Sequence, residues 1–523
     1  MRSLFLAIAL TTIVACNNAS VSADPSVTIA GELLLGEYVE NRTVAAFLGV
    51  PFAEPPVGEL RWRAPQPLRT KLERRDATEF APACMQTMRI LDWYRYMAES
   101  FGGSADFYDD LEISEDCLYL NIWTPRLDTE AKLPVMVWVH GGSNRSGWSY
   151  EPNYHGHRLA QEAVVVVTVA YRQGAFGFLS HPDLDTDEPA SNFGLWDIVA
   201  SLQWIQDHIE QFGGDPNRVT AFGESAGAQD ILALMFAEPA RDLFHRAILE
   251  STGGFGVDRV ATLAAEKKRG EDLGRLLGFE EGGTLQQLRQ VPADEILAVY
   301  EDAFADYYHS PALDGRLLTD SLWANIHAGR FGDQQLIIGT NASEWLDYIA
   351  ADATGEDVVS AADDLSQLDR SAALAAVASE TDPRRAMDRI TTAKNFLCPS
   401  QATAASMTAA GQSAWMYYFT RVREGKAGEK LGAYHGAELP YVFGTHDAYM
   451  PTTDIDQTLT ETLIRYWTQF AAAGNPNSER TPDWPQFNAP DYPVQELGDE
   501  VLAIPAPEPE LCAIFDARNT RQD

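Results

Sequence analysis

Ser225 stands between two glycines in the stretch GESAG, residues 223–227, which is a Gly-x-Ser-x-Gly pattern. The strand-like run Val219–Phe222 leads into this stretch, and a helix-forming run follows it. A sharp turn between a strand and a helix lifts a serine hydroxyl clear of the backbone, and it needs glycines because side chains would clash there. The pattern therefore predicts a nucleophilic serine. An ordinary serine in a glycine turn is the alternative.

A second candidate element is the stretch HGGSN, residues 140–144, directly after the strand-like run Val135–Val139. Acyl transfer builds negative charge on a carbonyl oxygen, and backbone N–H groups must already point at that oxygen. Small residues after a strand can present such donors, although a flexible loop is the alternative. The two stretches together are more specific than either one.

A serine hydroxyl needs a general base, and the base needs an acid that orients it. In α/β-hydrolases these three groups follow the chain order serine, acid, histidine. The downstream candidates are Glu344 in the stretch IIGTNASEW and His435 in the stretch GAYHGAELPYVFG. Local context favours His435 over three further downstream histidines, His309, His327 and His446.

Apolar runs rich in β-branched residues predict strands at 133–139, 164–171, 218–222 and 336–339. Helical patterns at 196–211, 228–237 and 459–473 lie between or after them. This alternation predicts an α/β fold with a mostly parallel central sheet flanked by helices. No linker interrupts the chain, so residues 24–523 are expected to form one catalytic domain. The helical segments 254–310 and 345–395 are candidates for a cap or lid.

The chain has 523 residues and a formal net charge of −37. Nucleic acid is a poor partner for such a chain, because phosphate binding needs clustered lysine and arginine. No ligand cluster has the spacing of a zinc site, so we expect no metal and no organic cofactor. No later segment is apolar enough to span a membrane.

The N-terminus carries Arg2, a short apolar run and the small residues Val21–Ala23, which predicts a secretory signal over residues 1–23. A lipoprotein signal over residues 1–15, with Cys16 lipidated as a membrane anchor, is the alternative. Either reading places the protein outside the cytoplasm, secreted or periplasmic in the first case. Four cysteines remain after removal of residues 1–23, and an oxidising compartment favours disulfides among them.

With these motifs the chain resembles the type-B carboxylesterase family, the cholinesterase-like branch of the α/β-hydrolase fold, and it resembles a bacterial exported member. The similar stretches cover nearly the whole mature chain in the order of the family: 47–67, 114–125, 212–227, 243–251, 339–345, 434–444, 470–477 and 482–487.

The resemblance implies a role for each matching residue. Ser225 matches the acyl-forming nucleophile, Glu344 the acid and His435 the general base. The oxyanion donors would be the backbone N–H groups of Gly142, Ser143 and Ala226. The resemblance also implies two disulfides, Cys84–Cys117 beside the active-site gorge and Cys398–Cys512.

Three departures from the family pattern bear on the substrate. Ser143 replaces a third glycine, which leaves a backbone donor in place. Trp345 follows the acid and is a candidate for the pocket lining. Arg145 lies two residues after a proposed oxyanion donor. It is a candidate for holding a substrate carboxylate, although pairing with a neighbouring acid is the alternative.

The predicted activity is hydrolysis of a small-molecule carboxylic ester through an acyl-enzyme. Arg145 leaves open a specialised esterase for anionic polycarboxylate esters, such as toxin side-chain esters. The aromatic residues of the loop between Cys84 and Cys117 could bind an apolar group or could simply pack the loop. A non-catalytic binding module of the same fold is a further alternative, and the oligomeric state is left open.

Overall fold

The structure is a computed structural model that describes residues 24–69, 72–184, 188–252, 261–305, 307–446 and 448–520. The predicted signal segment, with Cys16 and both predicted cleavage sites, lies outside the described residues. Within the described residues, no helix has the length and apolar character needed to cross a membrane.

An 11-stranded sheet with the order β18-β17-β16-β15-β12-β11-β9-β10-β8-β4-β3 forms the centre of the molecule. Its strands are β3 Glu37–Val39, β4 Val44–Pro51, β8 Tyr119–Thr124, β9 Leu133–Val139, β10 Val165–Val169, β11 Gly214–Glu224, β12 Arg246–Glu250, β15 Gln335–Asn341, β16 Ala414–Phe419, β17 Val494–Leu497 and β18 Val501–Ile504. The strands from β10 to β17 pair in parallel, and those at both edges pair antiparallel.

The central strands are buried on both faces, which explains their continuous apolar runs. Along β9, Val135, Val137 and Val139 belong to one core cluster, while Met136 and Trp138 belong to a second. Successive side chains of a strand point to opposite faces of its sheet. The two clusters therefore form the two packed layers between the sheet and its helices.

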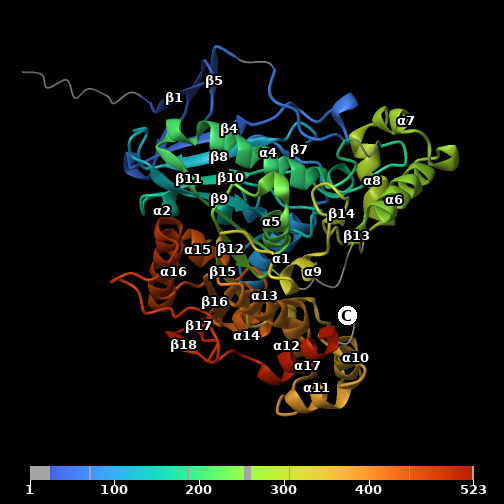
Figure 1. Cartoon of the computed structure of the whole chain (residues 1–523), viewed down its shortest axis with the longest axis vertical. Coiled ribbons are helices and arrows are strands. Elements are labelled where there is room, and N and C mark those ends of the chain that lie inside the picture. The colour runs from blue at the N-terminus through green and yellow to red at the C-terminus, as the bar shows by residue number, and fades with distance from the viewer. Residues whose placement is uncertain are drawn as a thin grey trace, which may run out of the picture.

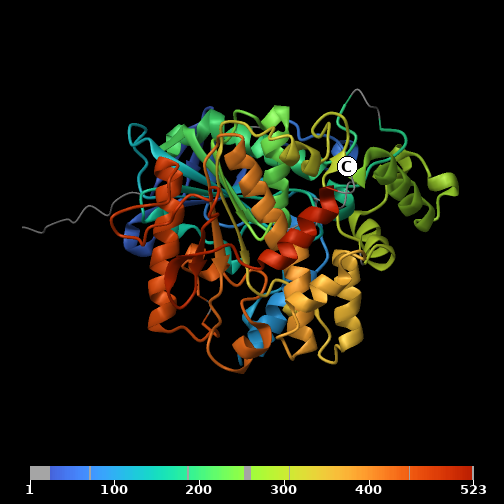
Figure 2. The same ribbon diagram turned by 60° about the horizontal axis from the view of Figure 1, so that its bottom comes forward.

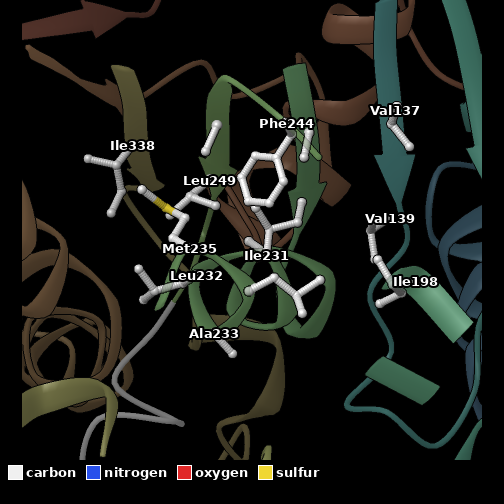
Figure 3. Packing of buried hydrophobic residues seen from close by; sticks show 14 of the residues in the cluster. Val137, Val139, Ile198, Ile231, Leu232, Ala233, Met235, Phe244, Leu249 and Ile338 are labelled. Atoms are coloured by element: carbon white, nitrogen blue, oxygen red, sulfur yellow. The ribbon is translucent and has the colours of Figure 1, made fainter. Parts of the chain in front are cut away.

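Helices cover both faces of the sheet. The helices of the first cluster include α4 Phe193–His208, α5 Ala226–Phe236, α13 Cys398–Ala409 and α17 Pro509–Thr520, and those of the second include α2 His157–Ala160, α15 Leu439–Phe443 and α16 Asp454–Ala473. Figure 3 shows Ile231, Leu232 and Met235 of α5 beside Leu249 of β12 and Ile338 of β15. This packing fixes the helix that follows Ser225.

Two groups of helices lie toward the same side of the molecule in both overall views (Figures 1 and 2). They fall within the two segments that the sequence predicts to be helical. The first group is α6 Leu263–Leu276, α7 Leu285–Arg289 and α8 Ala293–Ala303, and the second is α10 Gly355–Leu365, α11 Arg370–Ala376 and α12 Pro383–Thr392.

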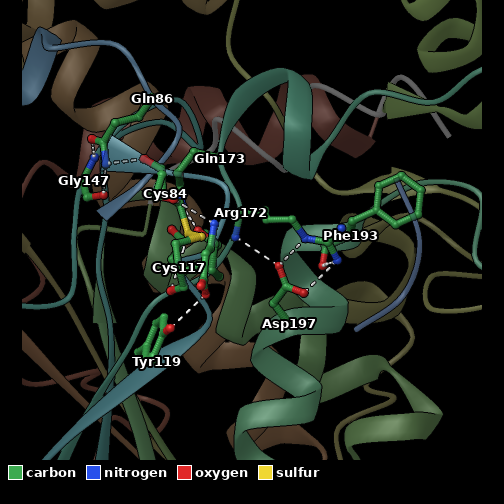
Figure 4. The surroundings of a disulfide bond; sticks show 12 residues. Cys84, Gln86, Cys117, Tyr119, Gly147, Arg172, Gln173, Phe193 and Asp197 are labelled. Carbon is green, nitrogen blue, oxygen red and sulfur yellow. Dashed lines mark hydrogen bonds and ion pairs between the residues drawn. A yellow bond between two sulfur atoms is a disulfide. The ribbon is translucent and has the colours of Figure 1, made fainter. Parts of the chain in front are cut away.

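Both disulfides that the resemblance implies are present, Cys84–Cys117 and Cys398–Cys512. The first closes the loop that contains helix α1, Arg89–Ser100. Figure 4 shows this disulfide near two polar anchors. The side chain of Gln86 accepts from and donates to the backbone of Gly147, at 2.7 and 2.9 Å. The guanidinium of Arg172 donates two bonds of 2.8 Å to Asp197.

Candidate active site

A cavity with an empty volume of about 520 Å³ brings the candidate residues together at the carboxyl ends of the parallel strands. This edge is where open α/β sheets bind their ligands. The cavity is lined by Arg89, Ser143, Ser225, Ala226, Gln229, Ser251, Tyr308, His309, Ser310, Trp345, Tyr348 and His435.

Ser225 occupies the sharp turn between β11 and α5. Its backbone has φ 55° and ψ −121°, which L residues rarely adopt. The two glycines are required by close approach to the neighbouring strand. A Cβ at position 223 would lie 2.5 Å from the carbonyl oxygen of Val139, and one at position 227 would lie 2.1 Å from the same atom. The predicted strand, turn and helix are therefore confirmed.

Glu344 and His435 are hydrogen-bonded. Nδ1 of His435 lies 2.5 Å from Oε2 of Glu344, whose side chain is fully buried. The other carboxylate oxygen, Oε1, accepts the backbone N–H of Asn341 at 2.7 Å. With both oxygens engaged, the carboxylate is fixed and holds the imidazole in one orientation.

Backbone contacts join the two loops that carry this pair. Ser343 forms an isolated bridge with Tyr434, and its N–H donates to the carbonyl of Ala433 at 3.0 Å. Ser343 directly precedes Glu344 in the chain, and Tyr434 directly precedes His435. The sequence separates Glu344 from His435 by 91 positions, and strand pairing between β15 and β16 brings the loops together.

Glu224, the residue before Ser225, is a second carboxylate beside the histidine. Its Oε1 lies 3.1 Å from Nε2 of His435, but this oxygen has no hydrogen-bond partner. The contact is therefore electrostatic and leaves Nε2 available to another group. Burial alone would lower the pKa of His435, but the carboxylates of Glu224 and Glu344 raise that pKa to about 9. Burial raises the pKa of Glu224 itself to about 7.

The loop after β9 carries the candidate oxyanion donors. Gly142 and Ser143 both have positive φ, at 103° and 62°. The hydrogen bonds of the described residues include none donated by the N–H of either residue. The N–H of Ala226, the first residue of α5, belongs to the helix end that has no intrahelical acceptor.

The side chain of Asn144 anchors this loop to three other segments. Its side-chain amide donates to Asp230 at 3.1 Å and to the carbonyl of His309 at 3.2 Å, and its Oδ1 accepts from Tyr171 at 3.2 Å. Asn144 is thus a structural anchor of this loop.

Arg145 does not line the cavity, in contrast to its predicted place in the substrate pocket. Its guanidinium is buried and donates to the backbone carbonyls of Phe304, Ala305 and Tyr307. It also lies over the ring of Tyr300. The prediction failed because these carbonyls, more than 150 positions away in the chain, occupy the side chain.

Trp345 does line the cavity. Its ring lies 4.9 Å from that of Tyr348 and 6.0 Å from that of Phe396, which in turn lies 5.3 Å from His435. None of the aromatic residues between Cys84 and Cys117 lines the cavity: Trp93, Tyr94, Tyr96, Phe101, Phe107 and Tyr108. Several of them pack against one another, as Tyr94 does with Trp93 and Tyr108.

The other downstream histidines are bound to structural partners. Nε2 of His309 lies 2.6 Å from the hydroxyl of Tyr300, and burial lowers its pKa to about 3. His446 lies between Arg423 and Thr460, and His327 contacts the carbonyl of Trp323. Sequence reasoning missed Arg89, Gln229, Tyr308 and Tyr348 as lining residues, and no local motif marks them.

A more voluminous cavity, of about 1020 Å³, lies between the N-terminal strands and α4. It contains none of the candidate residues, and its Glu32 and Arg75 pair with each other at 2.7 Å. We therefore place the chemistry in the smaller cavity. The part of the chain that the structure describes contains no group of three His, Cys, Asp or Glu residues arranged to hold a metal ion.

Comparison with known proteins assigns the class. The Carboxylesterase family matches residues 23–509, and the chain belongs to this family. It is 32% identical over 469 residues to the fumonisin B1 esterase of Sphingopyxis macrogoltabida, covering 85% of this chain and 82% of that protein.

Two solved structures of PNB esterase have the same fold. They superpose with TM-scores of 0.80 and 0.79 at 30% and 31% identity, covering 94% of this chain and 99% and 100% of theirs. The predicted α/β-hydrolase fold is confirmed, and the protein is a hydrolase of carboxylic esters.

Proposed function

We propose that the protein hydrolyses carboxylic esters through an acyl-enzyme on Ser225, with His435 as general base and Glu344 as the acid that orients it. The observation that carries this proposal is the hydrogen bond from His435 Nδ1 to the buried Glu344, in a cavity that Ser225 and His435 both line.

In the first step, Oγ of Ser225 attacks the ester carbonyl while Nε2 of His435 takes the hydroxyl proton. The tetrahedral oxyanion accepts hydrogen bonds from the N–H groups of Gly142, Ser143 and Ala226. The C–O bond to the alcohol breaks, and His435 donates its proton to the leaving oxygen. A water molecule then attacks the acyl-enzyme and gives a proton to His435. The bond between the acyl carbon and Oγ of Ser225 breaks, His435 returns the proton to Oγ, and the acid is released.

The electrostatics favour this sequence. Imidazolium forms in each step, and the carboxylates of Glu344 and Glu224 both stabilise its positive charge, which is the reason they raise the pKa of His435. The strained backbone of Ser225 places its hydroxyl at the N-terminal end of α5, where the helix dipole favours a developing negative charge.

The test compares wild type with Ser225→Ala on short, long, aromatic, choline and polycarboxylate esters. Because one relative is named for fumonisin B1, that ester belongs in the panel. We expect turnover by wild type and its loss in the variant, together with loss of fluorophosphonate labelling. Turnover that survives in a folded Ser225→Ala variant would overturn the proposal.

We also infer that the protein is exported. The two disulfides support this, since such bonds persist in oxidising compartments. The N-terminal residue of the mature protein is the test. A start at Asp24 indicates a free periplasmic or secreted protein, a lipidated Cys16 indicates a membrane anchor, and an uncleaved Met1 contradicts export by either signal.

A further inference from the structure

Arg89 is the first residue of α1 and reaches the catalytic cavity from the disulfide-closed loop. Its Nη1 lies 3.4 Å from Oγ of Ser143, and its Nη2 lies 3.4 Å from the hydroxyl of Tyr308. The guanidinium also lies 5.5 Å from the centre of the Tyr308 ring. These contacts are long and involve neutral groups, so they use little of the bonding capacity of a guanidinium.

No carboxylate of the described residues forms an ion pair with this guanidinium. Among the described residues, Arg89 forms no ion pair within 4.0 Å, in contrast to Arg95 of the same helix, which pairs with Asp110 at 2.8 Å. The residues that line the cavity include no aspartate or glutamate. This is notable in a chain with 76 acidic residues and a net charge of −37.

Gln229 supplies a second, independent observation. It lies one helical turn after Ser225 on α5, is 5% exposed and lines the same cavity. Its amide nitrogen Nε2 has no hydrogen-bond partner. A buried donor that lacks a partner costs about 1–3 kcal/mol. The natural explanation for such a donor in a cavity is a ligand that accepts from it.

We propose that Arg89 and Gln229 form a carboxylate-binding subsite, so that the preferred substrates are esters that carry a free carboxylate near the scissile bond. A guanidinium matches the planar geometry of a carboxylate. Arg89 touches the side chain of Ser143, whose N–H is a proposed oxyanion donor. The bound carboxylate is therefore separated from the ester carbonyl by only a few bonds.

The buried carboxylate of Glu224, which precedes Ser225 in the chain, opposes this binding only weakly. Burial raises the pKa of Glu224 to about 7, so this carboxyl is protonated in a fraction of the molecules at neutral pH. The proposal assigns to Arg89 the role that the sequence suggested for Arg145. It rests on the proposed esterase function.

The test uses two matched ester pairs, in which an isopropyl group replaces the carboxylate. In the first pair the acyl part of the ester carries the carboxylate, in monoethyl succinate, or the isopropyl group, in ethyl 4-methylpentanoate. In the second pair the alcohol part carries the carboxylate, in 3-acetoxypropanoate, or the isopropyl group, in 3-methylbutyl acetate. The measured quantity is the anionic-to-neutral ratio of kcat/KM, in wild type and in Arg89→Gln, Arg89→Lys and Arg95→Gln.

We expect wild type to prefer the anionic ester in at least one pair, and that pair identifies the side that carries the carboxylate. Arg89→Gln should lower the ratio about 10- to 100-fold, as for loss of a charged hydrogen bond. Arg89→Lys should retain part of the preference. Arg95→Gln, which changes the same helix away from the cavity, should leave the ratio unchanged.

Equal losses on both members of each pair in Arg89→Gln would overturn the subsite, as would a wild-type preference for both neutral esters. Fluorophosphonate labelling of Ser225 separates this failure from failure of the esterase proposal. A labelled variant with an unchanged ratio contradicts only the subsite. Absence of labelling and turnover in folded wild type contradicts the nucleophile itself.

Discussion

The carboxylate of Glu224 lies 3.1 Å from Nε2 of His435, at the ring nitrogen opposite the one that Glu344 engages. One imidazole is thus in contact with two carboxylates on different sides. The chain places one of them next to the candidate nucleophile and brings the other from the loop after β15. This arrangement favours the protonated ring more than a single acid would.

The arrangement predicts a shift in pH dependence. In the proposed mechanism His435 must be neutral to accept the serine proton, so kcat/KM should rise with pH as the ring deprotonates. The neighbouring carboxylates raise the pKa of His435 to about 9. Glu224→Gln removes one of them and should move the rising limb to lower pH by about one unit.

Profiles of kcat/KM against pH for a neutral ester measure this shift, because they report the groups of the free enzyme. Glu238→Gln, at an exposed glutamate, is the control and should not move the limb. A limb that stays in place or moves to higher pH in Glu224→Gln would contradict the prediction.

Replacing Glu344, the proposed orienting acid, should reduce the rate far more than it reduces binding. Glu344→Gln keeps the size of the side chain, but its amide can donate to His435 Nδ1 and so favours the wrong tautomer. We expect kcat to fall by about 10⁴-fold, with a smaller change in KM. Steady-state kinetics on a neutral ester measures both, and a kcat within tenfold of wild type would exclude this role for Glu344.

Gly227, two residues after Ser225, should tolerate no side chain. Gly227→Ala places a Cβ 2.1 Å from the carbonyl of Val139, so we expect a loss of about 1–3 kcal/mol in the free energy of unfolding. Gly355→Ala is the matched control, because a Cβ there meets no atom within 4 Å. It should be neutral or stabilising by less than about 1 kcal/mol. Urea unfolding compares the two, and equal stabilities would refute the argument from close packing.

The two disulfides should contribute unequally to stability. Cys398–Cys512 closes a separation of 114 residues, and Cys84–Cys117 one of 33. In the chain-entropy description, removing the longer bridge by a double alanine substitution should cost about 1 kcal/mol more than removing the shorter one. Denaturant unfolding of the two double variants is the measurement. A larger loss for the 84–117 pair would show that local packing outweighs loop entropy.

Several strands of the central sheet could be predicted from the local pattern of apolar residues. The run 133–139 corresponds to β9, and the runs 218–222 and 336–339 lie within β11 and β15. Buried parallel strands need continuous apolar residues, so their composition marks them. The turn at Ser225 could also be predicted, since only glycine fits positions 223 and 227 beside β9. The order of Ser225, Glu344 and His435 then followed from the chemistry of the family that the sequence resembles.

The residues that surround the substrate could not be predicted in this way. Arg145 is near the oxyanion loop in sequence, but the carbonyls of Phe304, Ala305 and Tyr307 bind it in the structure. Arg89 is distant in sequence, and α1 brings it to the cavity. A strand or a tight turn depends on a few neighbouring residues, and the sequence by itself determined those. The cavity wall depends on contacts between segments far apart in the chain, and only the tertiary structure decided which arginine lines the cavity.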